Sequence, residues 1–202
     1  MNQKLVQVAE AMGMKGKGIL AADESSGTIK KRFDGIGAES TEANRRDYRE
    51  MLFRSTDALR DYISGIILFD ETLRQSSDDG TPLVQIISQT GAIPGIKIDK
   101  GAHNLAGAPG EKVTEGLDGL RERLAEYYEL GARFTKWRAV IDIGRSGGRS
   151  IPSAYCIGAN AHALARMAAL SQEQGLVPIV EPEVLMDGDH DIDRCFEATE
   201  AT

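Results

Sequence analysis

The stretch Phe134-Thr135-Lys136-Trp137-Arg138-Ala139-Val140 has the composition of a β-strand, because aromatic and β-branched residues gather shortly after Gly131, a helix-ending glycine. Alternate side chains of a strand share a face, so Phe134, Lys136 and Arg138 point to one side and Trp137 to the other. Two cations on one face of a short apolar strand are costly to bury unless an anionic group meets them. The stretch therefore predicts a strand that carries two cations toward an anionic partner or ligand.

Four other short apolar runs have a similar character, and most of them end in a charged residue. These expected strands are Ile19–Asp23, Ile63–Phe69, Gly95–Asp99 and Val177–Glu181. Successive strands begin roughly 30 to 45 residues apart, which leaves room for a helical crossover between parallel neighbours. The chain therefore predicts β-α units repeated five times, either in an open doubly wound sheet or in a (β/α)₈ barrel.

Helical patterns fill most of the gaps between these strands. The expected helices are Met1–Met12, Thr28–Phe33, a helix capped by Ser40-Thr41 that runs to about Arg54, Pro82–Ser88, Gly116–Leu130, Pro152–Gln174, and a last helix capped by Asp189. The segments 101–110 and 144–150 are rich in glycine and polar residues and are expected to be loops.

The charged residues on the predicted inward faces favour the barrel. Each lies at or near the C-terminal end of its strand: Asp23, Lys97, Asp99, Lys136, Arg138 and Glu181. In a barrel these ends converge around one axis, on the face where barrel enzymes keep their catalytic groups. An open sheet would spread the same residues along a crevice.

The converging residue types indicate amine and phosphate chemistry. Neighbouring lysines depress each other's pKa, which makes an amine available near neutral pH, and carboxylates beside them can move protons. Cations near a helix start suit a phosphorylated substrate, and Ser25, Ser26 and Thr28 add hydroxyl and N–H groups there. The alternative interpretation is a set of structural ion pairs that line a barrel mouth.

Composition limits the class of protein. With 202 residues, 41% of them hydrophobic, the chain is expected to form a single domain over residues 1–202. A net charge of −7 argues against a nucleic-acid or anionic-membrane partner, and no apolar run is long enough to span a bilayer. The two cysteines, Cys156 and Cys195, are far apart, which suits a cytoplasmic protein with reduced thiols. His103, His162 and His190 lack metal-ligand spacing, so no metal is expected.

Five motifs, in order, resemble the class I fructose-bisphosphate aldolases of glycolysis. They are Gly18-Ile-Leu-Ala-Ala-Asp-Glu-Ser25, Ile67-Leu-Phe-Asp-Glu-Thr-Leu73, Gly95-Ile-Lys-Ile-Asp-Lys-Gly101, Lys136-Trp-Arg138 and Val177-Pro-Ile-Val-Glu-Pro-Glu183. The resemblance implies a (β/α)₈ barrel, usually a homotetramer, that needs no metal or other cofactor. It implies reversible cleavage of fructose 1,6-bisphosphate to dihydroxyacetone phosphate and glyceraldehyde 3-phosphate through a lysine Schiff base.

The resemblance also implies roles for individual residues. Asp23 would steer proton transfer, Lys136 would aid carbinolamine formation and dehydration, and Glu181 would be the general acid/base with Glu183 beside it. The residues expected to line the substrate, chiefly its phosphates, are Ser25, Thr28, Arg32, Lys97 and Arg138, with Arg45 as a further candidate.

One departure from the family is serious. The family's Schiff-base lysine lies on the sixth strand, in a motif like Leu-Lys-Pro-Asn-Met, and the 202 residues contain no such motif. A full barrel takes about 250 residues, so the chain is expected to cover the first five β/α units of an aldolase, incomplete at the C-terminal end. On its own it is expected to be inactive and, with open strand edges, aggregation-prone.

Two other functions remain as alternatives. One is a non-catalytic truncated aldolase paralogue that acts by binding or assembly. The other is a different phosphate-handling barrel enzyme, such as an isomerase that uses Glu181 as its base.

Overall fold

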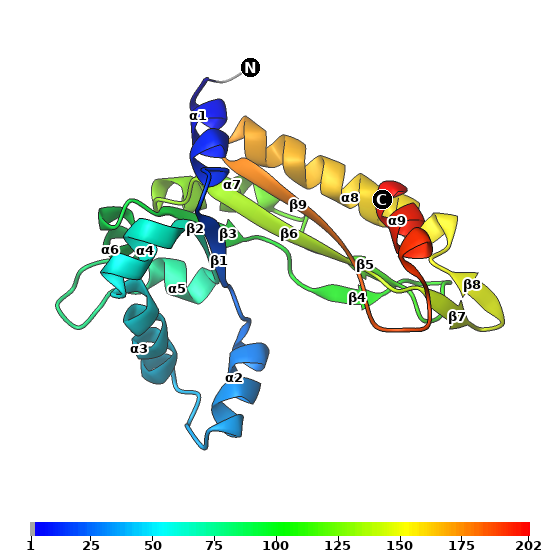
Figure 1. Cartoon of the computed structure of the whole chain (residues 1–202), viewed down its shortest axis with the longest axis horizontal. Helices are drawn as coiled ribbons and strands as arrows, with labels where there is room; N and C mark the ends of the chain where they lie inside the picture. The colour runs from blue at the N-terminus through cyan, green and yellow to red at the C-terminus, as the bar shows by residue number, and fades with distance from the viewer. Residues whose placement is uncertain (1–2) are drawn as a thin grey trace.

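A five-stranded parallel sheet forms the centre of the protein, and its strand order is β1-β2-β3-β6-β9 (Figure 1). The structure, a computed structural model, describes residues 3–202. The strands of the sheet are β1 (Gly18–Ala22), β2 (Ile63–Leu68), β3 (Ile93–Lys97), β6 (Phe134–Ile141) and β9 (Val177–Val184). Every neighbouring pair is parallel, so the prediction of five parallel strands is confirmed, although β3 runs from Ile93 to Lys97 rather than from Gly95 to Asp99.

Helices connect the strands, mostly near the predicted positions, but the two short helices at residues 56–62 and 70–74 were not predicted. They are α1 (Gln3–Met12), α2 (Ser26–Gly35), α3 (Glu42–Phe53), α4 (Thr56–Tyr62), α5 (Asp70–Arg74), α6 (Leu83–Gln89), α7 (Leu120–Glu129), α8 (Ala154–Glu173) and α9 (Ile192–Glu200). The main core lies between the sheet and these helices, where Trp137 of β6 is completely buried among residues of α6, α7 and α8. Thr41 caps α3 as expected, because its side chain accepts a hydrogen bond from the N–H of Asn44.

The opposite face of the sheet is the inward face of the expected barrel. Its centre is Phe134, which is completely buried and packs with Ile67 and with Met12 at the end of α1. Gly95 makes room for this ring, because a Cβ there would lie 2.2 Å from the nearest ring carbon. Phe134 and Trp137 therefore lie on opposite faces of β6, as the alternation of its side chains predicts.

Two helix boundaries differ from the predictions. The helix predicted from Gly116 begins four residues later, at Leu120, because Gly116 and Gly119 have φ angles of +132° and +62°, which are not helical. The prediction that Asp189 caps the last helix is also wrong. Asp191 is the cap, since its side chain accepts a hydrogen bond from the N–H of Arg194.

Each predicted loop overlaps a small antiparallel hairpin that continues past the predicted end of the loop. The first pairs β4 (Ala102–Asn104) with β5 (Lys112–Thr114), and the second pairs β7 (Gly144–Ser146) with β8 (Arg149–Ile151). The first hairpin is tied to α8, where the Asn160 side chain donates to the carbonyl of Lys112. The segments therefore form ordered extensions of the sheet's C-terminal side (Figure 1).

The sheet curls but does not close. Within residues 3–202, β1 and β9 each have a single neighbouring strand and form the two edges. No helix in this part of the chain is long and apolar enough to cross a membrane.

Candidate active site

The register of the sheet aligns the predicted cations. Lys97 of β3 lies opposite Lys136 of β6, and Arg138 lies opposite Glu181 of β9. Parallel strands in register bring their C-terminal ends to one edge of the sheet, so these side chains gather on the inward face at that edge. The convergence predicted from the strand ends is confirmed by the geometry of the strands.

Lys136 is the centre of the group. Its Nζ lies 3.3 Å from Asp23 Oδ2, just beyond the end of β1, and 3.3 Å from Glu181 Oε2 on β9. The side chains of Lys136 and Asp23 are only 11% and 12% exposed, whereas that of Glu181 is 34% exposed. An ammonium group between two carboxylates, one of them open to solvent, can hold and exchange protons beside a bound molecule.

A second ion pair joins the same two strands. The Nε of Arg138 donates to Glu183 Oε2, so both predicted carboxylates of β9 are paired with cations of β6. Both partners of this pair are about two-fifths exposed, so the guanidinium of Arg138 can also reach an anionic ligand.

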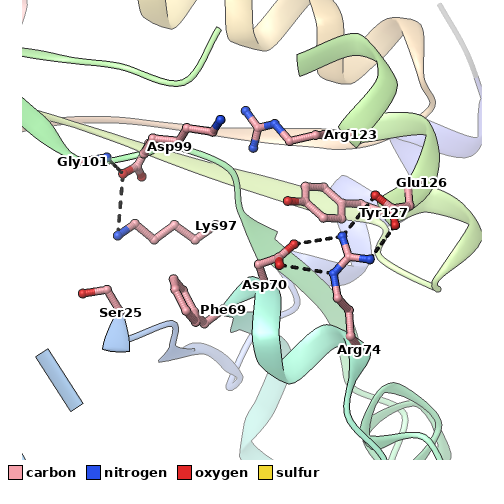
Figure 2. Close-up of a pocket in the computed structure, with 11 residues that line it drawn as sticks. Ser25, Phe69, Asp70, Arg74, Lys97, Asp99, Gly101, Arg123, Glu126 and Tyr127 are labelled. Atoms are coloured by element: carbon pink, nitrogen blue, oxygen red, sulfur yellow. Dashed lines mark hydrogen bonds and ion pairs between the residues drawn. The ribbon is translucent and has the colours of Figure 1, made fainter. Parts of the chain in front are cut away.

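A cavity of about 620 Å³ lies at the end of β3, the strand beside β6 (Figure 2). Lys97 extends into it between Ser25 and Asp99, and the far side is formed by Arg74 with its partners Asp70 and Glu126. The hydroxyl of Ser25, at the start of α2, lies 3.2 Å from that of Thr28. A lysine and a hydroxyl at a helix start that line one cavity are suited to a phosphate group.

Arg32 and Arg45 have other partners in this structure. Arg32 is paired with Glu24 at 2.7 Å, and its side chain is 60% exposed. Arg45 donates to both carboxylate oxygens of Glu71, at 2.8 and 2.6 Å, and to the carbonyl of Ser40. The hydrogen bonds from Arg45 hold the pKa of Glu71 below its usual value. Neither arginine joins the Lys136 cluster, so their roles at a substrate stay predictions.

Sequence reasoning missed Arg49, a completely buried arginine of α3. It donates to the carbonyl of Glu24 at 2.6 Å and to the hydroxyl of Thr72 at 2.6 Å, and it lies near the carboxylates of Glu24 and Glu71. Burial lowers the pKa of this arginine, and the two carboxylates oppose that shift. Arg49 thereby ties the segment after β1, which carries Asp23 and Ser25, to α5. No signal in the sequence singles it out, because α3 carries an ordinary charged pattern with several arginines.

Among residues 3–202, no group of three or more histidine, cysteine, aspartate or glutamate side chains is placed to hold a metal ion. The groups that define the cluster are its lysines, arginines and carboxylates.

Comparison with known proteins agrees with this geometry. The family description "Fructose-bisphosphate aldolase class-I" matches residues 4–202. The chain belongs to the class I fructose-bisphosphate aldolases. The resemblance carried by the five motifs is thus confirmed, and so is the assignment of the half-closed parallel sheet to the (β/α)₈ barrel family.

Individual aldolases resemble the chain over nearly its whole length. A probable fructose-bisphosphate aldolase class 1 of Xanthomonas campestris is 66% identical over 200 residues, covering 99% of this chain and 58% of the relative. Fructose-bisphosphate aldolase 1 of Toxoplasma gondii is 57% identical and covers 98% of this chain and 54% of the relative.

A solved structure shows the same fold. The aldolase of Plasmodium falciparum, crystallised with TRAP and a small-molecule inhibitor, superposes with a TM-score of 0.92 at 49% identity. That match covers 98% of this chain and 56% of the other. The chain therefore spans a little over half the length of the aldolases that it matches.

Proposed function

We propose that this chain carries the proton-transfer and phosphate-binding groups of a fructose-bisphosphate aldolase, an enzyme that reversibly cleaves fructose 1,6-bisphosphate to dihydroxyacetone phosphate and glyceraldehyde 3-phosphate. The observation that carries the proposal is the position of Lys136, whose Nζ lies 3.3 Å from both Asp23 and Glu181. We assign this activity to the polypeptide that the gene encodes.

The reaction needs an amine nucleophile and proton carriers. In the family a sixth-strand lysine attacks the ketone carbon, and the resulting carbinolamine hydroxyl takes up a proton and leaves as water, which produces a protonated imine. The C3–C4 bond then breaks: its electrons move into the imine to form an enamine, and the C4 hydroxyl loses its proton to a carboxylate. Glu181 is the more exposed carboxylate of the cluster and suits that exchange with a substrate.

Lys136 and Asp23 act around this proton exchange. The ammonium of Lys136 stabilises negative charge that develops on oxygen, and it can donate the proton that the departing hydroxyl needs. Asp23 holds the ammonium by a hydrogen bond of 3.3 Å. Glu183 forms an ion pair with Arg138, and this pair fixes the two charged side chains on the neighbouring strands β6 and β9.

The phosphates are assigned to the cavity beside the cluster. Lys97 and Ser25 line this cavity, and the Thr28 hydroxyl lies 3.2 Å from that of Ser25. Arg138 of β6 is not among the lining residues, and its guanidinium is the further cation that the proposal assigns to phosphate. Arg32 and Arg45 are paired with Glu24 and Glu71 and are not among the residues that line the cavity, so they are second-rank ligands in this proposal.

Borohydride trapping tests the proposal. The encoded polypeptide is incubated with dihydroxyacetone phosphate and sodium borohydride, and the modified peptide is identified by mass spectrometry. We expect release of triose phosphates from fructose 1,6-bisphosphate in a coupled assay, with the trapped lysine in a sixth-strand motif outside residues 1–202. A trapped adduct on Lys136 or Lys97 would overturn the roles proposed for these two lysines.

Other outcomes identify the alternatives. Substrate binding without cleavage or trapping would favour a non-catalytic aldolase relative. Interconversion of another sugar phosphate, with no triose phosphate produced, would favour an isomerase that uses Glu181 as its base.

Location and assembly are part of the same proposal. An Arabidopsis thaliana relative, 55% identical, is named a cytosolic aldolase, and we extend that location to this protein. A homotetramer is expected from the family. Size-exclusion chromatography with light scattering on the encoded polypeptide would measure the number of subunits.

A further inference from the structure

Asp99 is a buried carboxylate just beyond the end of β3, with a side chain only 3% exposed. Its Oδ1 accepts a hydrogen bond of 3.1 Å from the N–H of Gly101, and its Oδ2 accepts one of 3.4 Å from the N–H of Arg138 on β6. A buried carboxylate is costly unless it is paired and hydrogen-bonded, so these contacts fix its position. Asp99 therefore belongs to the framework that joins the ends of β3 and β6.

The same carboxylate faces Lys97 without binding it closely. The distance from Asp99 Oδ1 to Lys97 Nζ is 3.6 Å, which is longer than a hydrogen bond (Figure 2). Attraction at this distance restrains the flexible lysine side chain and leaves its three N–H donors available for a ligand. The ammonium of Lys97 lies in the cavity that Ser25 also lines.

The backbone of Arg138 is held from both sides. Asp99 accepts from its N–H, and the hydroxyl of Thr114 donates to its carbonyl at 2.8 Å. Asp99 thus contacts both Lys97, through its ammonium, and Arg138, through its main chain. These two residues carry the cations that the proposed function assigns to phosphate.

We propose that Asp99 is a positioning residue for phosphate binding, which acts by holding the ammonium of Lys97 in the cavity. This inference rests on the phosphate-binding part of the proposed function. If only charge mattered, removing the Asp99 carboxylate would strengthen phosphate binding, because a carboxylate repels an anion bound nearby. A positioning role predicts weaker phosphate binding instead.

The test compares Asp99→Asn with Asp142→Asn in the encoded polypeptide, with inorganic phosphate as the probe. Asp142 is exposed just after β6, so both substitutions remove one negative charge at the same edge of the sheet. We expect Asp99→Asn to weaken phosphate binding about tenfold and Asp142→Asn to leave it within about twofold. Asp99→Glu restores the charge and is expected to recover part of the affinity.

A double-mutant cycle separates positioning from general structural damage. If Asp99 acts through Lys97, Asp99→Asn has little further effect on phosphate affinity in a Lys97→Met background. An equal loss in both backgrounds would overturn the proposal. Equal or tighter phosphate binding by Asp99→Asn, or no phosphate binding by the unsubstituted protein, would overturn it as well.

A second measurement needs no ligand and applies even to a destabilised variant. The acetylation rate of Lys97 is measured by mass spectrometry relative to that of Lys15, an exposed reference lysine. We expect Asp99→Asn to raise this ratio about threefold because the ammonium is released. An unchanged ratio would overturn the proposal. If the variants show the expected phosphate affinities but the protein cleaves no fructose 1,6-bisphosphate, the proposed function is contradicted and the role of Asp99 stands.

Discussion

Replacing Gly95 with alanine is expected to destabilise the protein by about 3 kcal/mol, the upper end of the usual range for overpacking. A Cβ at Gly95 would lie 2.2, 2.3 and 2.5 Å from three ring atoms of Phe134. Carbon atoms in contact lie about 3.5–4.0 Å apart, so the ring would have to move by more than about 1 Å. It has little room to do so, because a Cβ at Gly65 would already lie 3.0 Å from the same ring.

Urea unfolding of the encoded polypeptide, followed by circular dichroism, measures this loss. Gly158→Ala is the control, because Gly158 lies inside α8 with nothing within 4 Å of an added Cβ, and alanine is the better helix former. The control is expected to be neutral or more stable. Adding Phe134→Leu to Gly95→Ala is expected to recover part of the loss. A Gly95→Ala variant within about 0.5 kcal/mol of the parent would refute the packing argument.

Four further outcomes are expected. Lys136→Met should lower kcat for fructose 1,6-bisphosphate cleavage by about a hundredfold or more with the fold intact, in a coupled assay; retention of more than a tenth of the activity would contradict its role. The pKa of Glu71 is lowered in the folded protein, so its pairing with Arg45 stabilises the fold above the ordinary pKa of 4.5. This stabilisation is lost as the pH falls through the folded pKa, so Glu71→Gln should flatten the acid side of a plot of unfolding free energy against pH. A curve parallel to that of the parent protein would argue against this. Burial raises the pKa of the Cys156 thiol to about 11. Iodoacetamide at about pH 8 should therefore alkylate Cys156 far more slowly in the folded protein than in urea, as measured by peptide mass spectrometry. Equal alkylation rates would contradict the burial of this thiol. The 202-residue chain expressed alone should self-associate through the edges of β1 and β9, and light scattering that shows a monodisperse, cooperatively unfolding monomer would count against that expectation.

The five parallel strands were predictable because such strands leave a strong signal: short apolar runs, spaced for helical crossovers. The hairpins were not, because three-residue strands such as β4 and β7 are too short to show alternation. The start of α7 depends on the backbone angles at Gly116 and Gly119, and glycine is compatible with both helix and turn.

The candidate site was predictable as far as the strand ends determine it. Lys136, Asp23 and Glu181 meet because register brings their strands' ends together. The partners of Arg45 and the burial of Arg49 were not predictable, since α3 shows an ordinary charged sequence. Which of its arginines becomes buried depends on how the helix packs against segments far away in the chain.

The position of Arg49 constrains how the C-terminal edge of the sheet can move. Its guanidinium bonds the main chain of Glu24 and the side chain of Thr72, so the segment after β1 and the short helix α5 form one mechanical unit. Opening either of them alone would leave a buried cation without its acceptors, which is costly. Asp23 and Ser25 flank Glu24, whose carbonyl Arg49 holds, so a movement of this segment for a substrate would have to carry α5 with it.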